Sequence, residues 1–169
     1  MRLTATQRAD LWLRQATPIA LTVLLAVLSA VPIGMPGYSA VVPGYTAMAA
    51  FYWAVFRPDL QPPFSLFVVG VLQDILVATP LGMTALSLMV VHGLAVSQRR
   101  AFLGKPFALA WLGFVLIHAL SAFGVWLLVS ILALQPVGPE PAVFQYLVTV
   151  TLFPVVAWMF VRIHRYVVR

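Results

Sequence analysis

The stretch that decides the fold reads Gly70-Val71-Leu72-Gln73-Asp74-Ile75-Leu76-Val77-Ala78-Thr79-Pro80-Leu81-Gly82. It begins as an apolar helix, carries one carboxylate at Asp74, and breaks at the turn from Thr79 to Gly82 before a second apolar helix begins. Because a carboxylate in hydrocarbon costs at least ~2.5 kcal/mol, Asp74 is expected to face a protein interior and not lipid. The sequence therefore predicts that this helical hairpin is the core of the fold.

The composition of the whole chain indicates a membrane protein. Of its 169 residues, 63% are hydrophobic and only 8% are charged, which is more apolar surface than a soluble domain of this length can bury. We therefore predict one all-α integral membrane domain over residues 1–169. There is no cysteine, which excludes disulfides, thiolate metal sites and cysteine nucleophiles.

Apolar runs and turn signals divide the chain into six predicted transmembrane helices. Proline- and glycine-rich turns, above all the segment 32–37, and two polar loops, 57–63 and 98–106, separate the runs. The expected spans are 16–32, 39–56, 63–79, 81–97, 107–134 and 141–161. Spans three and four are short for a hydrocarbon layer of about 30 Å, so their joining turn is expected to lie below the outer surface and to be covered by protein.

The positions of the basic residues predict the orientation of these helices. If the N-terminus is cytoplasmic, all 10 Lys and Arg residues fall in cytoplasmic segments, and the outer turns carry only Glu140. The net charge of +6 is thus interpreted as topology and not as a nucleic-acid surface. Both termini are predicted to be cytoplasmic. Residues 1–15 are either a helix lying at the membrane surface or a plain charged leader, and 162–169 form a basic tail.

Three polar side chains inside the membrane are expected to share one layer. If the hairpin turns about Pro80 and Leu81, Asp74 lies level with Ser87, and the next long helix brings His118 near the same depth. Such a layer has three readings: hydrogen-bonded contacts between the protein's own helices, a contact for another protein's membrane helix, or ion and proton handling. Gly70 would permit close helix approach.

The sequence argues against catalysis and against bound cofactors. A single embedded aspartate cannot form the carboxylate pair of an aspartic hydrolase, and the chain contains neither H-E-x-x-H nor G-x-S-x-G. We predict a protein that is not an enzyme and that has no catalytic, metal or cofactor residues. The aromatic residues Tyr52 and Trp53, close before Arg57, are expected to form a belt at the membrane interface.

The order of several short motifs resembles MreD, the family of rod shape-determining membrane proteins of bacteria. The motifs are Met35-Pro36, Pro43 opening a span, Tyr52-Trp53 before Arg57-Pro58, Gly70 with Asp74, the Pro80-Leu81-Gly82 turn, and Pro154 in the last span before the basic tail. The resemblance covers nearly the whole chain. It carries over Tyr52, Trp53, Pro58, Gly70, Asp74, Pro80 and Gly82, whose implied role is to shape the bundle and its contact face.

The resemblance implies a non-enzymatic scaffold of the cell-elongation complex in the bacterial plasma membrane. MreD-like proteins partner MreC and support lateral-wall peptidoglycan synthesis by RodA and its transpeptidase partner, with a less direct link to MreB filaments. Their fold is similar to that of the substrate-binding subunits of energy-coupling-factor transporters. Membrane lipids and a second copy of the chain are further expected contacts.

Two other functions stay open from the sequence. The similar fold suggests a small-solute-binding or transport subunit, which needs an outward pocket with convergent polar groups. The outer ends offer few such groups, which argues against a polar vitamin and leaves an apolar, lipid-like ligand. A proton-conducting element is the third reading, and it requires that Asp74→Asn abolish a flux while assembly is retained.

Overall fold

The chain is all-helical in the part that the structure describes. A computed structural model describes residues 5–30, 42–134 and 137–167. They form seven α-helices and one short 3₁₀ helix, with no strand among them. The elements are α1 Ala5–Ala30, α2 Tyr45–Phe56, η1 Pro58–Leu60, α3 Pro63–Val77, α4 Met83–Ser97, α5 Arg99–Phe102, α6 Phe107–Leu132 and α7 Glu140–Val167.

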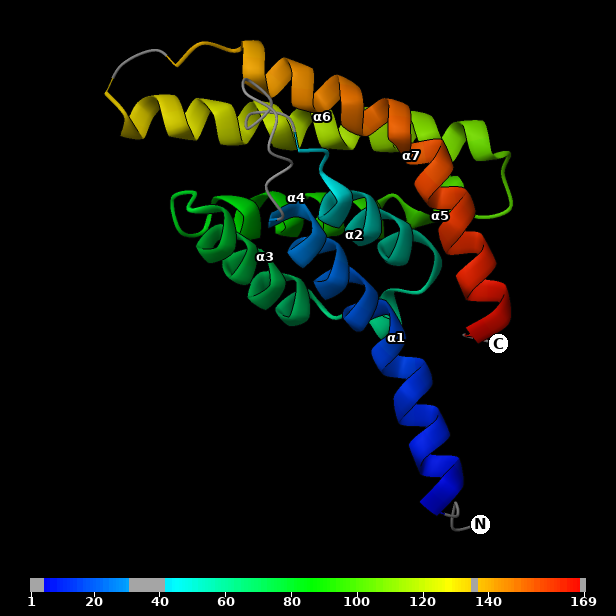
Figure 1. The fold of residues 1–169 in the computed structure, drawn as a ribbon. Coiled ribbons are helices and arrows are strands. Elements are labelled where there is room, and N and C mark those ends of the chain that lie inside the picture. The colour runs from blue at the N-terminus through cyan, green and yellow to red at the C-terminus, as the bar shows by residue number, and fades with distance from the viewer. Residues whose placement is uncertain (1–4, 31–41, 135–136, 168–169) are drawn as a thin grey trace.

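The helices are arranged in two groups. Figure 1 shows α6 and α7 together on one side of the molecule, with α7 crossing α6 obliquely, while α1 to α4 form the other side. Within the second group, α3 packs against α4 and α1, and α2 packs against α4 and α1. α2 also contacts α7, so it lies between the two groups. The first part of α1 projects away from the other helices (Figure 1).

The hydrophobic core is centred on α2, and the hairpin contributes to it mainly through α4. All ten residues from Thr46 to Val55 are buried, whereas α3 buries only Leu66, Val69, Gly70 and Asp74. The Phe51 ring lies at the centre, 5.3 Å from Phe114 and 5.7 Å from Phe153 between ring centroids. The prediction that the hairpin is the core of the fold is therefore right only in part: α4 contributes Leu88, Val91 and Ala95 to a core centred on α2, and α3 contributes Leu66.

The same burial corrects the predicted aromatic belt. Tyr52 is 3% exposed and Trp53 is fully buried, and both pack against Phe160 of α7. Aromatic residues close to a polar loop are typical of a membrane interface, but here they are core residues that join α2 to α7. Pro58 begins η1, where its fixed φ suits the first helical position.

Two helices are long and apolar enough to cross a membrane. They are Phe107–Leu132 and Glu140–Ile163. The other apolar stretches among the described residues are shorter, including Thr17–Ala30 within α1. α2, with 12 residues, is shorter than α3 and α4, which have 15 each. At 1.5 Å per residue α2 extends about 18 Å, less than a hydrocarbon layer of about 30 Å.

The helix positions agree closely with the predicted apolar runs. Each of the six runs overlaps one of α1, α2, α3, α4, α6 and α7, but α1 begins well before the first run and α7 extends beyond the last one. α2 starts at Tyr45 and not at residue 39, and the loop 98–106 contains the short α5, which the sequence did not suggest. Residues 5–15 belong to the same helix as the first run. The predicted turn at 32–37, including Met35-Pro36, and the final residues of the tail, 168–169, lie outside the described residues.

Candidate functional site

Asp74 is a capping residue for the helix that follows it. The side chain is fully buried, and its two carboxylate oxygens accept three hydrogen bonds. The Thr79 hydroxyl donates to Oδ1 over 2.8 Å, and the Gly82 and Thr84 backbone N–H groups donate to Oδ2 and Oδ1 over 2.8 and 3.0 Å. The first N–H groups of a helix have no partner within the helix, so Asp74 satisfies donors at the start of α4.

The turn sequence explains how the carboxylate reaches α4. α3 ends at Ala78 in the left-handed conformation, with φ of 57°, and the Thr79 N–H donates to the Asp74 carbonyl. The chain then reverses through Pro80 and Leu81, and Gly82 has φ of 96°, a conformation that glycine adopts without steric cost. The reversal brings the Gly82 and Thr84 N–H groups directly to Asp74.

Gly70 allows the two hairpin helices to approach each other closely. A Cβ atom at this position would lie 2.6 Å from the backbone nitrogen of Ala85 in α4. Because backbone atoms cannot move aside as a flexible side chain can, no larger residue fits without separating the helices. The prediction that Gly70 permits close approach is confirmed. Glycine at 70 and the cap at Asp74 thus hold α3 and α4 together at two levels.

The predicted layer of Asp74, Ser87 and His118 does not form as one hydrogen-bonded group. Asp74 bonds to its own turn, whereas the Ser87 hydroxyl lies 2.8 Å from the Ser121 hydroxyl of α6. The His118 ring stacks on Phe114 at 5.2 Å and lies 5.7 Å from the Tyr146 ring. The depths expected from residue counting agree with the structure in that Ser87 and His118 line one cavity. The side chains do not point in the directions that a shared layer with Asp74 requires.

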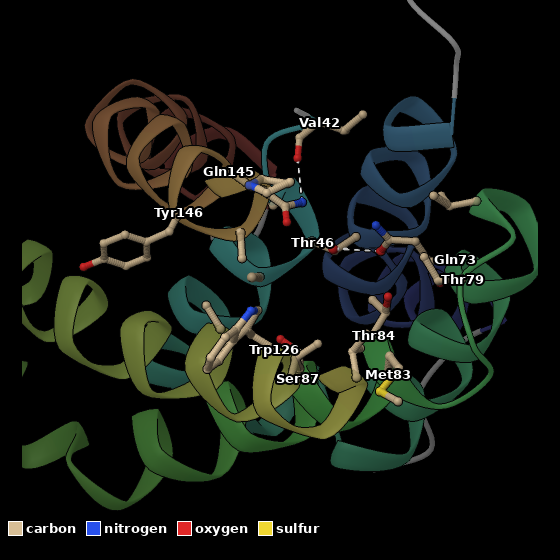
Figure 2. Close-up of a pocket in the computed structure, with 18 of the residues that line it drawn as sticks. Val42, Thr46, Gln73, Thr79, Met83, Thr84, Ser87, Trp126, Gln145 and Tyr146 are labelled. Atoms are coloured by element: carbon tan, nitrogen blue, oxygen red, sulfur yellow. Dashed lines mark hydrogen bonds between the residues drawn. The ribbon is translucent and has the colours of Figure 1, made fainter. Parts of the chain in front are cut away.

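That cavity is a feature that the sequence did not predict. Its volume is about 490 Å³, and residues of α1, α2, α3, α4, α6 and α7 line it. Figure 2 shows Gln73 and Gln145 on opposite sides of it, with Thr46 donating to Gln73 Oε1 over 2.8 Å and Gln145 Nε2 donating to the Val42 carbonyl over 2.8 Å. The spacing of polar residues in the sequences of α3 and α7 does not indicate this cavity, because Gln73 and Gln145 come to its walls only when the helices pack.

A narrower groove adjoins the cavity between α6 and α7. Its volume is about 280 Å³, and it shares Ala122, Trp126, Ala142 and Tyr146 with the cavity. The other lining residues, Ala119, Phe123, Pro139 and Val143, are apolar. Trp126 Nε1 donates to the Val137 carbonyl over 3.0 Å, which holds the indole at the junction. The cavity, which carries a few polar groups, and the apolar groove therefore meet at these four shared residues.

A second buried polar cluster joins α1 to the loop after α2. Gln61 is 1% exposed, and its Nε2 donates to the Thr22 hydroxyl over 2.7 Å. His92 Nε2 lies 3.2 Å from the Gln61 carbonyl, which can only accept, so this nitrogen carries the proton. His92 therefore contacts Gln61 and not Asp74. The cluster connects α1, the loop after α2 and α4, and its role is structural.

Comparisons of the chain with protein-family models, with curated proteins and with solved structures give no match. The structure places the positions that carry the resemblance to MreD in two regions: Gly70, Asp74 and Gly82 hold the α3–α4 hairpin, and Tyr52 and Trp53 lie in the α2 core. Among the described residues, no three His, Asp or Glu side chains are grouped to hold a metal ion.

Proposed function

We propose that this chain is an MreD-like scaffold of the bacterial plasma membrane, that it binds MreC through membrane helices, and that it supports lateral-wall synthesis by RodA and its transpeptidase partner. The proposal rests on the order of the motifs that resemble MreD and on the small extent of chain outside the helices. Connections such as 57–62 and 78–82 are too short to fold as separate domains. We therefore expect the protein to bind its partners through the faces of its helices.

The proposed topology has six spans with both termini in the cytoplasm. Figure 1 supports it, because the start of α1 and the end of α7 lie toward the same side as the α2–α3 connection and α5. These segments carry the basic residues, whereas the α3–α4 turn and the start of α7, with Glu140, lie toward the opposite side. The short helices α2, α3 and α4 fit this arrangement if the protein thins the bilayer locally or tilts its longer helices.

The exposed side of the second half of α6, which carries Gly124, Leu127, Leu128 and Ile131, is the face that we assign to MreC. It is the observation that carries the scaffold proposal furthest. None of the residues 122–132 is buried, although the preceding part of the same helix, 107–121, buries six residues. Gly124 is exposed there, and a Cβ atom at this position would meet nothing within 4 Å. Membrane helices associate through close approach at small residues, so one more helix can pack here.

Co-purification tests the assignment. The intact chain and MreC are expressed together, extracted in mild detergent and isolated through a tag on this chain. We expect MreC to be retained by the wild type and to be reduced about tenfold by Gly124→Leu, because a leucine prevents close helix approach. Gly93→Leu is the matched control, since Gly93 is also exposed with open space around it but lies on α4. Failure of the wild type to retain MreC would contradict the proposal.

A small-solute-binding or transport subunit is the second candidate, and the cavity is the observation that favours it. A volume of about 490 Å³ falls within the usual range for ligand pockets. Transport would require energising subunits that co-purify with the chain, together with uptake of a solute by cells. Purification that yields such subunits in place of MreC would favour this function over the scaffold.

A further inference from the structure

The charge of the cavity wall limits what the cavity can hold. Among the described residues that line it, none is Asp, Glu, Lys or Arg; the polar ones carry hydroxyl, amide or imidazole groups. A charged head group would be transferred from water into this site without a counter-ion, which is strongly unfavourable. The ligand that fits this wall is therefore uncharged.

Unpaired polar atoms around the cavity define the hydrogen bonds that such a ligand would make. Gln73 uses Oε1 to accept from Thr46, which leaves its amide NH₂ available, and Gln145 uses its NH₂, which leaves Oε1 available. His118 is 7% exposed, and its buried Nδ1 has no hydrogen-bond partner among the described residues. A donor on one wall faces an acceptor on the other, and hydroxyl groups satisfy both because each can donate and accept.

The groove between α6 and α7 provides the second half of the site. It meets the cavity at Trp126 and Tyr146 and has apolar walls, so an acyl chain fits it where a polar solute does not. In the membrane location proposed above, a molecule that enters by this route comes from the bilayer. This position of the groove distinguishes a lipid from a water-soluble vitamin.

We propose that the cavity and the α6–α7 groove together bind one uncharged, hydroxyl-headed, single-chain lipid of the monoacylglycerol type. The hydroxyl head lies between Gln73 and Gln145, beside His118, and the acyl chain lies in the groove past Trp126. The inference rests on the proposed membrane location but not on binding to MreC.

Quenching of tryptophan fluorescence tests the site. The purified full-length chain in detergent is titrated with a monoacylglycerol brominated in its acyl chain, because bromine quenches only nearby indoles. We expect saturable quenching in the wild type, loss of the saturable part in Trp126→Phe, and its retention in Trp158→Phe, a change at an exposed indole remote from the site. A brominated phosphatidylglycerol, which has an anionic head, is expected to give only linear quenching.

Two substitutions test the two halves of the proposed site. Ala122→Phe fills the junction and is expected to weaken the saturable quenching at least about tenfold, whereas Ala108→Phe, at an exposed position near the start of α6, leaves it unchanged. Gln145→Leu removes one hydrogen-bonding group of the head site at an exposed position and is expected to weaken binding about fivefold.

The proposal is overturned if quenching by the monoacylglycerol is linear in the wild type, or if the anionic lipid saturates with equal affinity. Should Ala122→Phe fail to elute as a single species in gel filtration, Gln145→Leu decides the matter, and unchanged affinity there contradicts the assigned head site. Retention of MreC is measured separately, so loss of lipid binding and loss of the scaffold function are distinguishable.

Discussion

Two buried polar regions of this molecule differ in how their hydrogen bonds are satisfied. At the α3–α4 turn, both Asp74 oxygens accept from donors of the same hairpin, and the Asp74 side chain is fully buried. Between α6 and α7, His118 lines a cavity of about 490 Å³, and its Nδ1 has no hydrogen-bond partner in the part of the chain that the structure describes. A satisfied buried group holds a fold together, whereas an unsatisfied group beside a cavity has capacity left for a ligand. The first region is therefore structural and the second is the candidate for binding.

The largest expected effect is that of Asp74→Ala. It leaves the Thr79 hydroxyl and the Gly82 and Thr84 N–H groups without an acceptor, at about 1–3 kcal/mol for each buried donor. We expect a loss of about 3–5 kcal/mol, seen as a fall of about 10 °C in the unfolding temperature in detergent. Asp59→Asn is the control, because Asp59 is exposed and its 3.5 Å pair with Arg57 contributes at most about 1 kcal/mol. Equal stability of the two variants would contradict a capping role for Asp74.

Gly70→Ala is expected to have the next largest effect. Its Cβ would lie 2.6 Å from the Ala85 nitrogen, so α3 and α4 must separate, at a cost of about 1–3 kcal/mol. Gly93→Ala on the neighbouring helix meets nothing within 4 Å and should be neutral or stabilising by up to about 1 kcal/mol. Chemical denaturation of both variants in the same detergent measures the difference. A Gly70→Ala protein as stable as Gly93→Ala would show that the hairpin is not closely packed.

Substitutions at Ala78 and Gly82, the two residues of the turn with positive φ, should change the stability of the protein in opposite directions. Gly82→Ala places a side chain at φ of 96°, which costs about 1–2 kcal/mol, whereas Ala78→Gly relieves the same strain at φ of 57°. We expect the first variant to unfold at a lower temperature than the wild type and the second at the same or a higher one. If both variants were destabilised equally, the turn geometry described here would be wrong.

His118→Phe is expected to have the smallest effect on stability. It tests whether the polar region beside the cavity, unlike the Asp74 turn, contributes little to the stability of the fold. Phenylalanine retains the ring packing against Phe114 and Tyr146 and removes the unpaired Nδ1. The stability should change by less than about 1 kcal/mol, toward higher stability, because no hydrogen bond between described residues is lost. A loss as large as that of Asp74→Ala, measured under the same conditions, would mean that His118 has a structural partner.

The sequence predicted the helices well because each apolar run is long and is bounded by proline, glycine or charge. It also predicted that Asp74 is buried, since the cost of an exposed carboxylate in hydrocarbon is large in any fold. Neither argument depends on how the helices pack.

The partners of the buried groups could not be predicted, because they depend on side-chain direction and on distant contacts. Counting residues from the turn places Ser87 level with Asp74, but Ser87 points toward Ser121 while Asp74 turns back to its own loop. The capping contact had a local signal in the Thr79 to Gly82 turn. No local sequence signal indicated the cavity, because Gln73 and Gln145 are 72 positions apart and come to the same cavity only when α3 and α7 are in place.

Hydrogen exchange at the Gly82 and Thr84 amides tests the central claim most directly, because these are the N–H groups that Asp74 is said to hold. In the wild-type chain both amides should exchange slowly compared with Gly104, which is exposed in the α5–α6 connection, and in Asp74→Ala they should exchange at a rate close to that of Gly104. Wild-type amides that exchange as fast as Gly104, or that keep their protection without Asp74, would contradict the account.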